Sequence, residues 1–278
     1  KAEGLDATFV TLGGRPLVTA GMTGSIDFVP IPSGAATAAL TGAEIRYVVG
    51  ESLRSHWFIV SRASVAKAED LKSKTVAYGR AGSADYDEGA AVMLRAFKME
   101  AGKDYKVISF AGEPERVAAL VNSSVDAALV SVAQVPQAVN AGMKVLVRVS
   151  DHIERAGGTL WTMKAFADKN PETVQKFIRA IAKATIYYRE NKAGSVPVLV
   201  EHFGISEKDA GTVWDETSKT FSPALPKDAF REIFESRRVS MIDEKQWPKD
   251  KPLPDPEQWL LRDVLDKTLK DMGYREAK

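Results

Sequence analysis

GEPERVAALVNSSVDAALVS (residues 112–131) carries the pattern that decides the fold. Gly112 is typical of a turn, and Pro114 is typical of the first turn of a helix, where its missing N–H leaves nothing unpaired. Apolar residues then recur at helical spacing as far as Val121, and VDAALV (125–130) is an apolar run of strand length. The stretch therefore predicts a helix followed by a buried strand.

The same pattern occurs earlier in the chain, in the same order. The matched pairs are Gly14-Arg15-Pro16 with Gly112-Glu113-Pro114, Ser25-Ile26-Asp27 with Ser124-Val125-Asp126, and Gly42 with Gly142. Such self-similarity indicates a duplication, or two lobes of one architecture. The alternative is that α/β proteins reuse strand-turn-helix patterns throughout, without any duplication.

Each copy predicts three strands that alternate with two helices. The expected strands are 7–12, 26–31 and 45–49 in the first copy, and 105–110, 125–130 and 144–149 in the second. Strands that are apolar on both faces and alternate with helices are typical of a parallel sheet covered on both sides. The predicted fold class is α/β, with each lobe an open, mostly parallel sheet covered by helices.

Two strand-like runs, HWFIVSR (56–62) and GGTLWTM (157–163), are expected to carry the chain between the lobes. The predicted first lobe is 1–60 plus 160–278, with the region after Asn170 helical, and the second lobe is 61–159. Lys1-Ala2-Glu3-Gly4 resembles the last turn of a helix with its glycine stop. The first lobe is therefore expected to lack an opening strand and helix.

Composition excludes several classes of protein. The 278 residues are 45% hydrophobic and 27% charged, which are ordinary values for a folded globular chain. The formal net charge is +1, and no stretch combines clustered Lys and Arg with aromatic residues, which argues against nucleic-acid binding. Cysteine is absent, which excludes disulfides, thiolate metal sites and a cysteine nucleophile. No apolar run reaches the length of a membrane span.

Small polar residues occur where expected strands end and helices begin. Ligands of open α/β sheets bind at such ends, because unpaired N–H groups and the helix dipole point there. The ligand-binding candidates are Gly13, Gly14, Ser33, Gly34, Ala35, His56, Arg80, Gly82, Ser83, Ala84 and Ser131. The alternative is that the glycines and serines are ordinary turn and capping residues. Arg80 and Arg15 could pair with an anionic group, and His56 could donate a hydrogen bond.

No catalytic or metal-binding constellation is found. The histidines lie apart at 56, 152 and 202, and neither HExxH, GxSxG, a P-loop nor GxGxxG occurs. Trp57, Tyr86 and Trp161 could stack on a planar ligand, although a core role fits Trp57 better. We therefore expect no enzyme activity, no cofactor and no metal.

Several segments resemble one known family in family order. They are EGLDATFVTLGG (3–14), GSIDF (24–28), LTGAEIRYVVG (40–50), AEDLKSKTVAYGRAGSADY (68–86), GEPERVAALVNSSVDAALVS (112–131) and KNPETVQKFIRAIAKA (169–184). The chain resembles the periplasmic substrate-binding proteins of ABC importers, in the NMT1-like branch that binds sulfonates, taurine, nitrate and thiamine pyrimidines. The resemblance covers about two thirds of the chain, so it bears on the fold more than on the ligand.

The resemblance implies a periplasmic-binding-protein type II fold and a receptor that captures a small organic ligand between its lobes. The expected ligand is an anion such as a sulfonate or carboxylate, although pyrimidines stay open. The expected partner is an ABC permease, and we expect an exported, periplasmic monomer whose signal peptide has been removed. A ligand that touches both lobes should close them about a hinge.

Two other classes of protein use similar architecture. One is the effector-binding domain of a transcription regulator, against which the lack of a helix-turn-helix segment weighs. The other is an enzyme related to thiamine-pyrimidine synthesis, which would need a Schiff-base lysine and cysteines. No lysine here lies in a distinctive apolar or glycine-rich setting.

Overall fold

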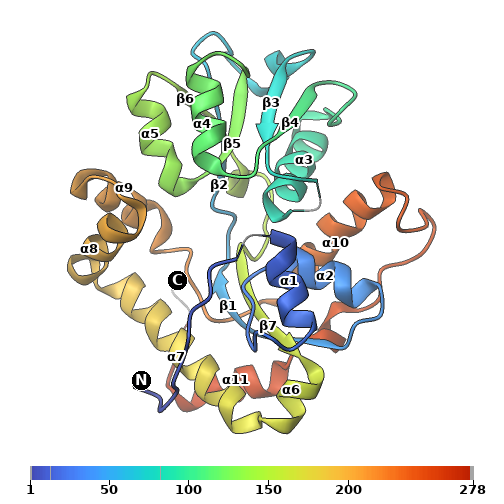
Figure 1. Cartoon of the computed structure of the whole chain (residues 1–278), viewed down its shortest axis with the longest axis vertical. Coiled ribbons are helices and arrows are strands. Elements are labelled where there is room, and N and C mark those ends of the chain that lie inside the picture. Colours follow the sequence, from blue (N-terminus) through green and yellow to red (C-terminus); the bar gives the residue numbers. More distant parts are fainter. Residues whose placement is uncertain (1, 13, 82, 276–278) are drawn as a thin grey trace. The chain divides into compact units, whose positions relative to one another are not determined.

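The computed structural model describes residues 2–12, 14–81 and 83–275, and its elements are labelled in Figure 1. Two expected ligand residues, Gly13 and Gly82, lie outside the described residues. Contacts divide the chain into two compact units. Unit 1 comprises residues 1–54, 155–195 and 218–278, and unit 2 comprises residues 55–154 and 196–217. The lobe bounds predicted from the sequence are 1–60 with 160–278 and 61–159. They describe lobes that would move as rigid bodies, and they stay a prediction.

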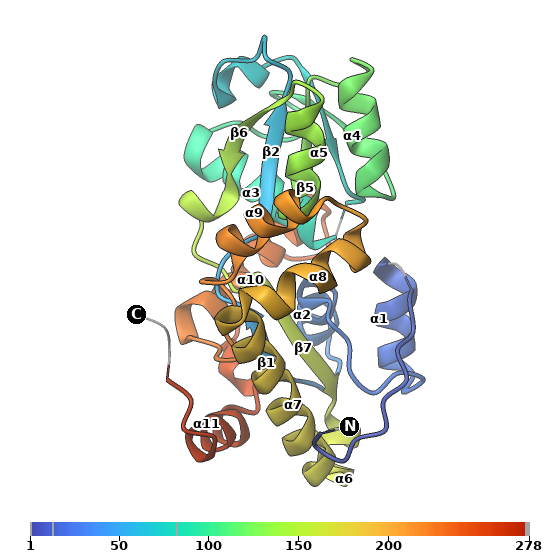
Figure 2. The ribbon, with the colours of Figure 1, turned by 90° about the vertical axis from the view of Figure 1, so that its left-hand side faces the viewer.

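Unit 1 is built on two antiparallel strands, β1 (Ile45–Ser52) and β7 (Gly158–Met163). Its helices are α1 (Gly14–Met22), α2 (Pro32–Leu40), α6 (Lys164–Lys169), α7 (Pro171–Glu190), α10 (Lys227–Asp243) and α11 (Arg262–Asp271). The α1 helix lies beside α2 (Figure 2). The core includes Tyr47 and Trp161, both fully buried, and Tyr47 packs edge-on against Phe230.

Two strands expected in unit 1 are not formed. Segment 26–31 makes a single bridge, between Val29 and Trp161, before α2 begins. Segment 7–12 has no regular structure, and Phe9 within it is 94% exposed. An extended segment becomes a strand only when its backbone groups find a partner, and among the described residues no strand pairs with 7–12. The prediction of strands at 7–12 and 26–31 was therefore wrong, because an apolar pattern does not show whether a segment has a partner strand.

Unit 2 contains a five-stranded sheet in the order β4-β3-β5-β2-β6. The strands are β2 (Trp57–Ser61), β3 (Thr75–Tyr78), β4 (Lys106–Ser109), β5 (Ala127–Ser131) and β6 (Lys144–Arg148). Parallel pairs join β3 to β4 and β5, while β2 is antiparallel to β5 and β6. The α/β fold class is confirmed. The sheet of unit 2 is mixed, with two parallel and two antiparallel pairings, and the paired strands of unit 1 are antiparallel.

The helices of unit 2 come from two parts of the chain. They are α3 (Ala84–Phe97), α4 (Glu113–Val121), α5 (Val135–Asn140) and α9 (Glu207–Thr217). The α8 helix (Lys192–Phe203) begins in unit 1 and continues into unit 2. Arg148 on β6 forms a part-exposed ion pair with Glu216 on α9, and contacts group residues 196–217 with unit 2. A segment far along the sequence therefore belongs to the body of unit 2.

The internal repeat corresponds to matching turns and helices. The matched motifs at 14 and 112 stand at the starts of α1 and α4. Gly42 and Gly142 have φ of +101° and +84°, in the left-handed region that favours glycine, and each precedes a strand, β1 or β6. The same backbone requirement explains why glycine recurs at both positions.

Gly34 illustrates how closely α1 and α2 pack. A Cβ added at Gly34 would overlap the Val18 side chain on α1 and lie 3.2 Å from Ile31 Cγ2. Alanine favours a helix interior by about 1 kcal/mol over glycine, whereas overpacking costs about 1–3 kcal/mol. We expect Gly34→Ala to lower the free energy of unfolding, measured by urea denaturation.

The double variant Val18→Ala/Gly34→Ala is the control, because it removes the methyl groups that the new Cβ would meet. The double variant should lose less unfolding free energy than the two single variants lose together. Additive effects in the double variant would show that the α1–α2 contact is not what excludes a side chain at position 34.

Candidate functional site

In unit 1, the N-terminus of α2 meets a fully buried arginine. Ser33, in the first turn of α2, is itself fully buried, and its Oγ accepts a hydrogen bond from Arg155 Nη2 at 2.8 Å. The Tyr47 hydroxyl donates to the Pro32 carbonyl at 2.6 Å. Burial raises the pKa of Tyr47 well above its usual value, and the nearby Arg155 opposes that rise in part. Strand β1 and the segment before β7 thus both fix the start of α2.

This part of unit 1 is electrostatically positive. A helix N-terminus carries a partial positive charge from its unpaired N–H groups, and the Arg155 guanidinium adds a full charge beside it. Neither α1 nor α2 has an acidic residue in its first turn. The arrangement can stabilise an anionic group.

The other residues of unit 1 that were expected to bind ligand lie in the core or at a helix start. Gly34 is pressed against Val18, and Ala35 is fully buried in the core cluster. Gly14 is exposed and begins α1 with φ +41°. Trp161 is fully buried, and its indole N–H donates to the Ile31 carbonyl at 3.2 Å, so Trp161 is a core residue here.

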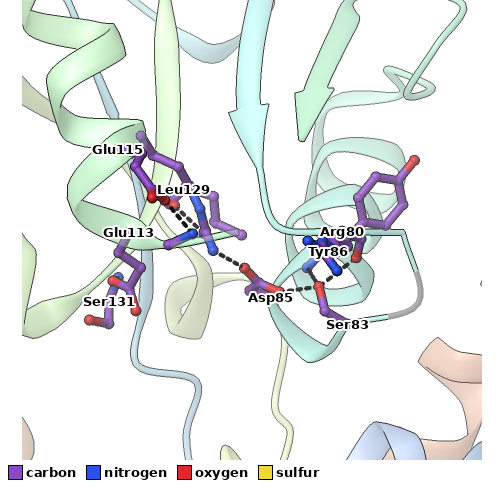
Figure 3. A network of polar contacts seen from close by, with 10 residues as sticks. Arg80, Ser83, Asp85, Tyr86, Glu113, Glu115, Leu129 and Ser131 are labelled. Atoms are coloured by element: carbon purple, nitrogen blue, oxygen red, sulfur yellow. Dashed lines mark hydrogen bonds and ion pairs between the residues drawn. The ribbon is translucent and has the colours of Figure 1, made fainter. Parts of the chain in front are cut away.

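In unit 2, the start of α3 is tied to α4 by a buried ion pair (Figure 3). Ser83 is the N-cap of α3, as predicted, and its hydroxyl also contacts the Asp85 carboxylate and the Arg80 carbonyl. The other Asp85 oxygen lies 2.6 Å from Arg116 Nη2, and both side chains are at least 92% buried. Arg116 also donates to the Leu129 carbonyl of β5 at 2.7 Å. One carboxylate thus joins two helices, and its partner arginine extends the network to a strand.

Carboxylates also occupy backbone donors around α4 (Figure 3). The Ser131 N–H donates to Glu113 Oε2 at 2.6 Å, and the Gly112 N–H donates to Glu115 Oε2 at 2.6 Å. Asp85 and Asp87 lie in the first turn of α3, and Glu113 and Glu115 in that of α4. These acids stabilise the helix starts. They also place negative charge where an anionic ligand would approach.

The remaining expected residues of unit 2 are Arg80, Ala84 and His56. Arg80 is exposed, and its carbonyl accepts from the Ser83 N–H at 2.9 Å. Ala84 is the first residue of α3. The His56 carbonyl accepts from the Val132 N–H at 2.9 Å, which joins it to the end of β5. The ligand-binding roles of all the expected residues stay predictions.

Sequence reasoning missed Arg155, Asp85, Arg116 and Glu113. Their partners are far away in the chain, since Arg155 and Ser33 are separated by 122 positions. Arg155 carried no local signal, because an arginine beside an apolar strand is ordinarily exposed to solvent. Asp85 carried only the signal of an acid in a first helical turn.

Two further findings concern the described residues. Within ranges 2–12, 14–81 and 83–275, no group of three or more His, Cys, Asp or Glu side chains could hold a metal ion. In the same ranges, no helix is both long and apolar enough to cross a membrane.

The buried ion pair predicts a stability difference between neighbouring substitutions. Asp85→Ala leaves the buried Arg116 charge without its carboxylate and should cost about 3–5 kcal/mol. Ser83→Ala removes a capping hydroxyl and should cost about 1 kcal/mol. Guanidinium denaturation midpoints measure both.

An apolar replacement of the whole pair, Asp85→Leu/Arg116→Met, is the matched control. It should recover much of the loss, because no uncompensated charge remains. A loss in Asp85→Ala no larger than that of Ser83→Ala would contradict the structural role of the pair.

Between 88% and 92% of the chain matches the three solved structures described here. The periplasmic aliphatic sulphonate binding protein SsuA from Escherichia coli is 18% identical, with a TM-score of 0.75 over 89% of this chain and 79% of that chain. The periplasmic nitrate-binding protein NrtA from Synechocystis PCC 6803 is 15% identical, with a TM-score of 0.71 over 92% and 77%. The desulfurization enzyme DSZB is 12% identical, with a TM-score of 0.64 over 88% and 85%.

At these identities the likeness concerns the fold, which is that of the two periplasmic binding proteins, as predicted. No curated protein shows significant sequence similarity to the chain. A family model, described as NMT1/THI5 like, matches residues 37–194, which is more than half of the chain. The chain therefore belongs to the NMT1/THI5-like family.

Proposed function

We propose that this protein is the solute-binding receptor of an ABC importer and that its ligand is a small organic anion. Family membership and the fold shared with SsuA and NrtA support a receptor. The observation that carries the choice of an anion is the pairing of buried Arg155 with the N-terminus of α2. An anion at this point would be stabilised by a full charge and by a helix dipole together.

The distribution of acids supports the same choice. First turns of α3 and α4 each carry two acidic residues, whereas those of α1 and α2 carry none. Acids at helix starts are favourable for helix stability, so their absence removes a stabilising feature. A carboxylate or sulfonate of the ligand would supply negative charge at the start of α2, whose first turn has none of its own. We therefore assign the anionic group of the ligand to unit 1.

The proposed role implies partners and a location. A receptor of this kind delivers its ligand to the permease subunits of an ABC transporter and works after export to the periplasm. SsuA and NrtA are both described as periplasmic. We propose that this protein is exported in the same way and acts as a monomer.

An enzyme is the second candidate, because DSZB has this fold and is described as a desulfurization enzyme. The present chain contains no cysteine, which removes the most nucleophilic side chain. We propose a non-catalytic role. Mass spectrometry of the ligand after denaturation of the complex should recover it unchanged, whereas a product that forms only with folded protein would favour the enzyme.

Calorimetric titration with short alkanesulfonates and carboxylates tests the receptor and the anion together. The best ligand of this panel should raise the melting temperature, because binding to the folded state alone stabilises it. Arg155→Met should weaken binding about tenfold or more, which corresponds to about 1.4 kcal/mol. Ser33→Ala should weaken binding less, because it moves the guanidinium without removing its charge.

Arg231→Met is the matched control, since Arg231 lies on α10 of the same unit and forms a part-exposed ion pair with Glu235. It should leave affinity unchanged. Equal affinities of Arg155→Met and Arg231→Met for the bound anion would overturn the assignment of the anion to α2. Failure of every anion in the panel to bind would overturn the choice of ligand class.

A further inference from the structure

Strand β1 contains an extra residue close to its end. Gly50 is paired with Thr159 and Ser52 with Gly158, so Glu51 has no opposite residue on β7. This is a β-bulge, in which the additional residue leaves the regular ladder and its side chain is redirected. Bulges are frequent beside binding sites for that reason.

The Glu51 side chain lies directly over a glycine. A Cβ added at Gly158 would be 2.8 Å from Glu51 Oε2 and 3.1 Å from Glu51 Cβ. Any residue other than glycine at position 158 would therefore displace the carboxylate. The neighbouring Gly157 is equally restricted, because a Cβ there would overlap the Arg54 carbonyl oxygen.

The Glu51 carboxylate makes no hydrogen bond or ion pair with any residue that the structure describes. The side chain lies against Gly158 on β7, and the main-chain carbonyl of Glu51 accepts a hydrogen bond from the Ser222 N–H at 3.1 Å. The side chain is part-buried, so it keeps access from outside. Burial, with no contribution from another charged group, raises the pKa of Glu51 to about 7.

Topology places Glu51 at the same end of the unit 1 sheet as the proposed anion site. This is the end where β1 finishes and β7 begins, and Arg155 directly precedes β7. Val29 pairs with Trp161 in the antiparallel sense, so the segment that leads into α2 also finishes at this end. A positive group and an unpaired carboxylate therefore share one end of a single two-stranded sheet.

We propose that Glu51 determines ligand specificity by accepting a hydrogen bond from an ammonium group of the ligand. The proposal rests on the proposed function, because it takes the anionic end of the same ligand to lie at α2. A part-buried charge without a partner is costly, and a cationic donor offsets that cost. The predicted ligand class is an amine-bearing organic anion, not a plain alkanesulfonate or carboxylate.

The test compares two ligands that differ only in the amine, 2-aminoethanesulfonate and ethanesulfonate. Calorimetry at about pH 8, where the Glu51 carboxyl is ionised, should show at least about tenfold tighter binding of the aminated ligand. At about pH 5.5 the carboxyl is protonated and the preference should shrink several-fold. Glu51→Gln should abolish the preference at the higher pH while leaving the affinity for ethanesulfonate within about twofold.

Two further variants sharpen the test. Gly158→Ala should also lose the preference, because its methyl group displaces the carboxylate. Glu172→Gln is the matched control, since Glu172 is an exposed glutamate in the first turn of α7 in the same unit. Glu172→Gln should keep the full preference and its dependence on pH.

Protein without ligand shows whether Glu51→Gln folds. A carboxyl whose pKa is higher in the folded than in the unfolded state lowers stability as pH rises from about 4.5 to about 7. The melting temperature of Glu51→Gln should therefore exceed that of the wild type at about pH 8 and approach it at about pH 5.

The possible outcomes separate the two proposals. Binding of both ligands with equal affinity by the wild type at the higher pH would overturn the role of Glu51 and leave the anion site standing. A preference that survives Glu51→Gln would do the same. Failure of both ligands and of the whole anion panel would overturn the proposed ligand class, and the role of Glu51 with it.

Discussion

The structure of unit 1 depends on the close approach of β1 and β7 at the point where the chain leaves the unit and returns to it. Gly157 lies so near the Arg54 carbonyl that no side chain fits, and its N–H donates to the Ser52 carbonyl at 2.9 Å. This contact fixes where β7 starts. It thereby fixes Arg155 two residues earlier, and with it the start of α2. A single steric constraint thus positions both the strand pair and the positive group of the proposed site.

The start of α2 in unit 1 differs in charge from the starts of α3 and α4 in unit 2. In unit 2, Asp85 and Glu113 fill the donors around α3 and α4 from within the chain, so the local charges are compensated before any ligand arrives. In unit 1 the helix start is paired with an arginine, which adds to the positive charge. Compensation gives unit 2 a rigid polar network. The positive charge beside α2 is the basis on which we propose that unit 1 holds the anionic group of the ligand.

Elements with a local signal were predicted well from the sequence. The apolar run of β5, the helix spacing of α4 and the glycines before β1 and β6 are read from neighbouring residues, and all of these elements formed. The strand expected at 7–12 failed because a strand also needs a partner, which adjacent residues do not reveal. Ser83 was correctly placed at a helix start for the same local reason.

Most of the candidate site lacked such a signal. Arg155 reaches Ser33, Arg116 reaches Asp85, and Glu113 reaches Ser131 across long stretches of sequence, so each contact exists only once the chain has folded. The position of Glu51 follows from the register of β1 against β7. That register includes a bulge, which the sequence does not predict. The sequence predicts where helices begin, whereas the charged residues that contact one another at these starts depend on the tertiary structure.

The interrupted course of unit 1 has a consequence for the order of folding. Joining β1 to β7 early would require closing a long loop, which costs chain entropy and slows folding. Residues 55–154 form one continuous part of unit 2, and within it Phe58 is paired with Arg148. Once that pair has formed, the ends of the intervening chain are already adjacent, and only a short closure remains for β1 and β7. Formation of unit 2 therefore favours pairing of β1 with β7 in unit 1. Substitutions that disrupt the β2–β6 pairing should slow formation of the β1–β7 sheet, although neither β2 nor β6 belongs to it.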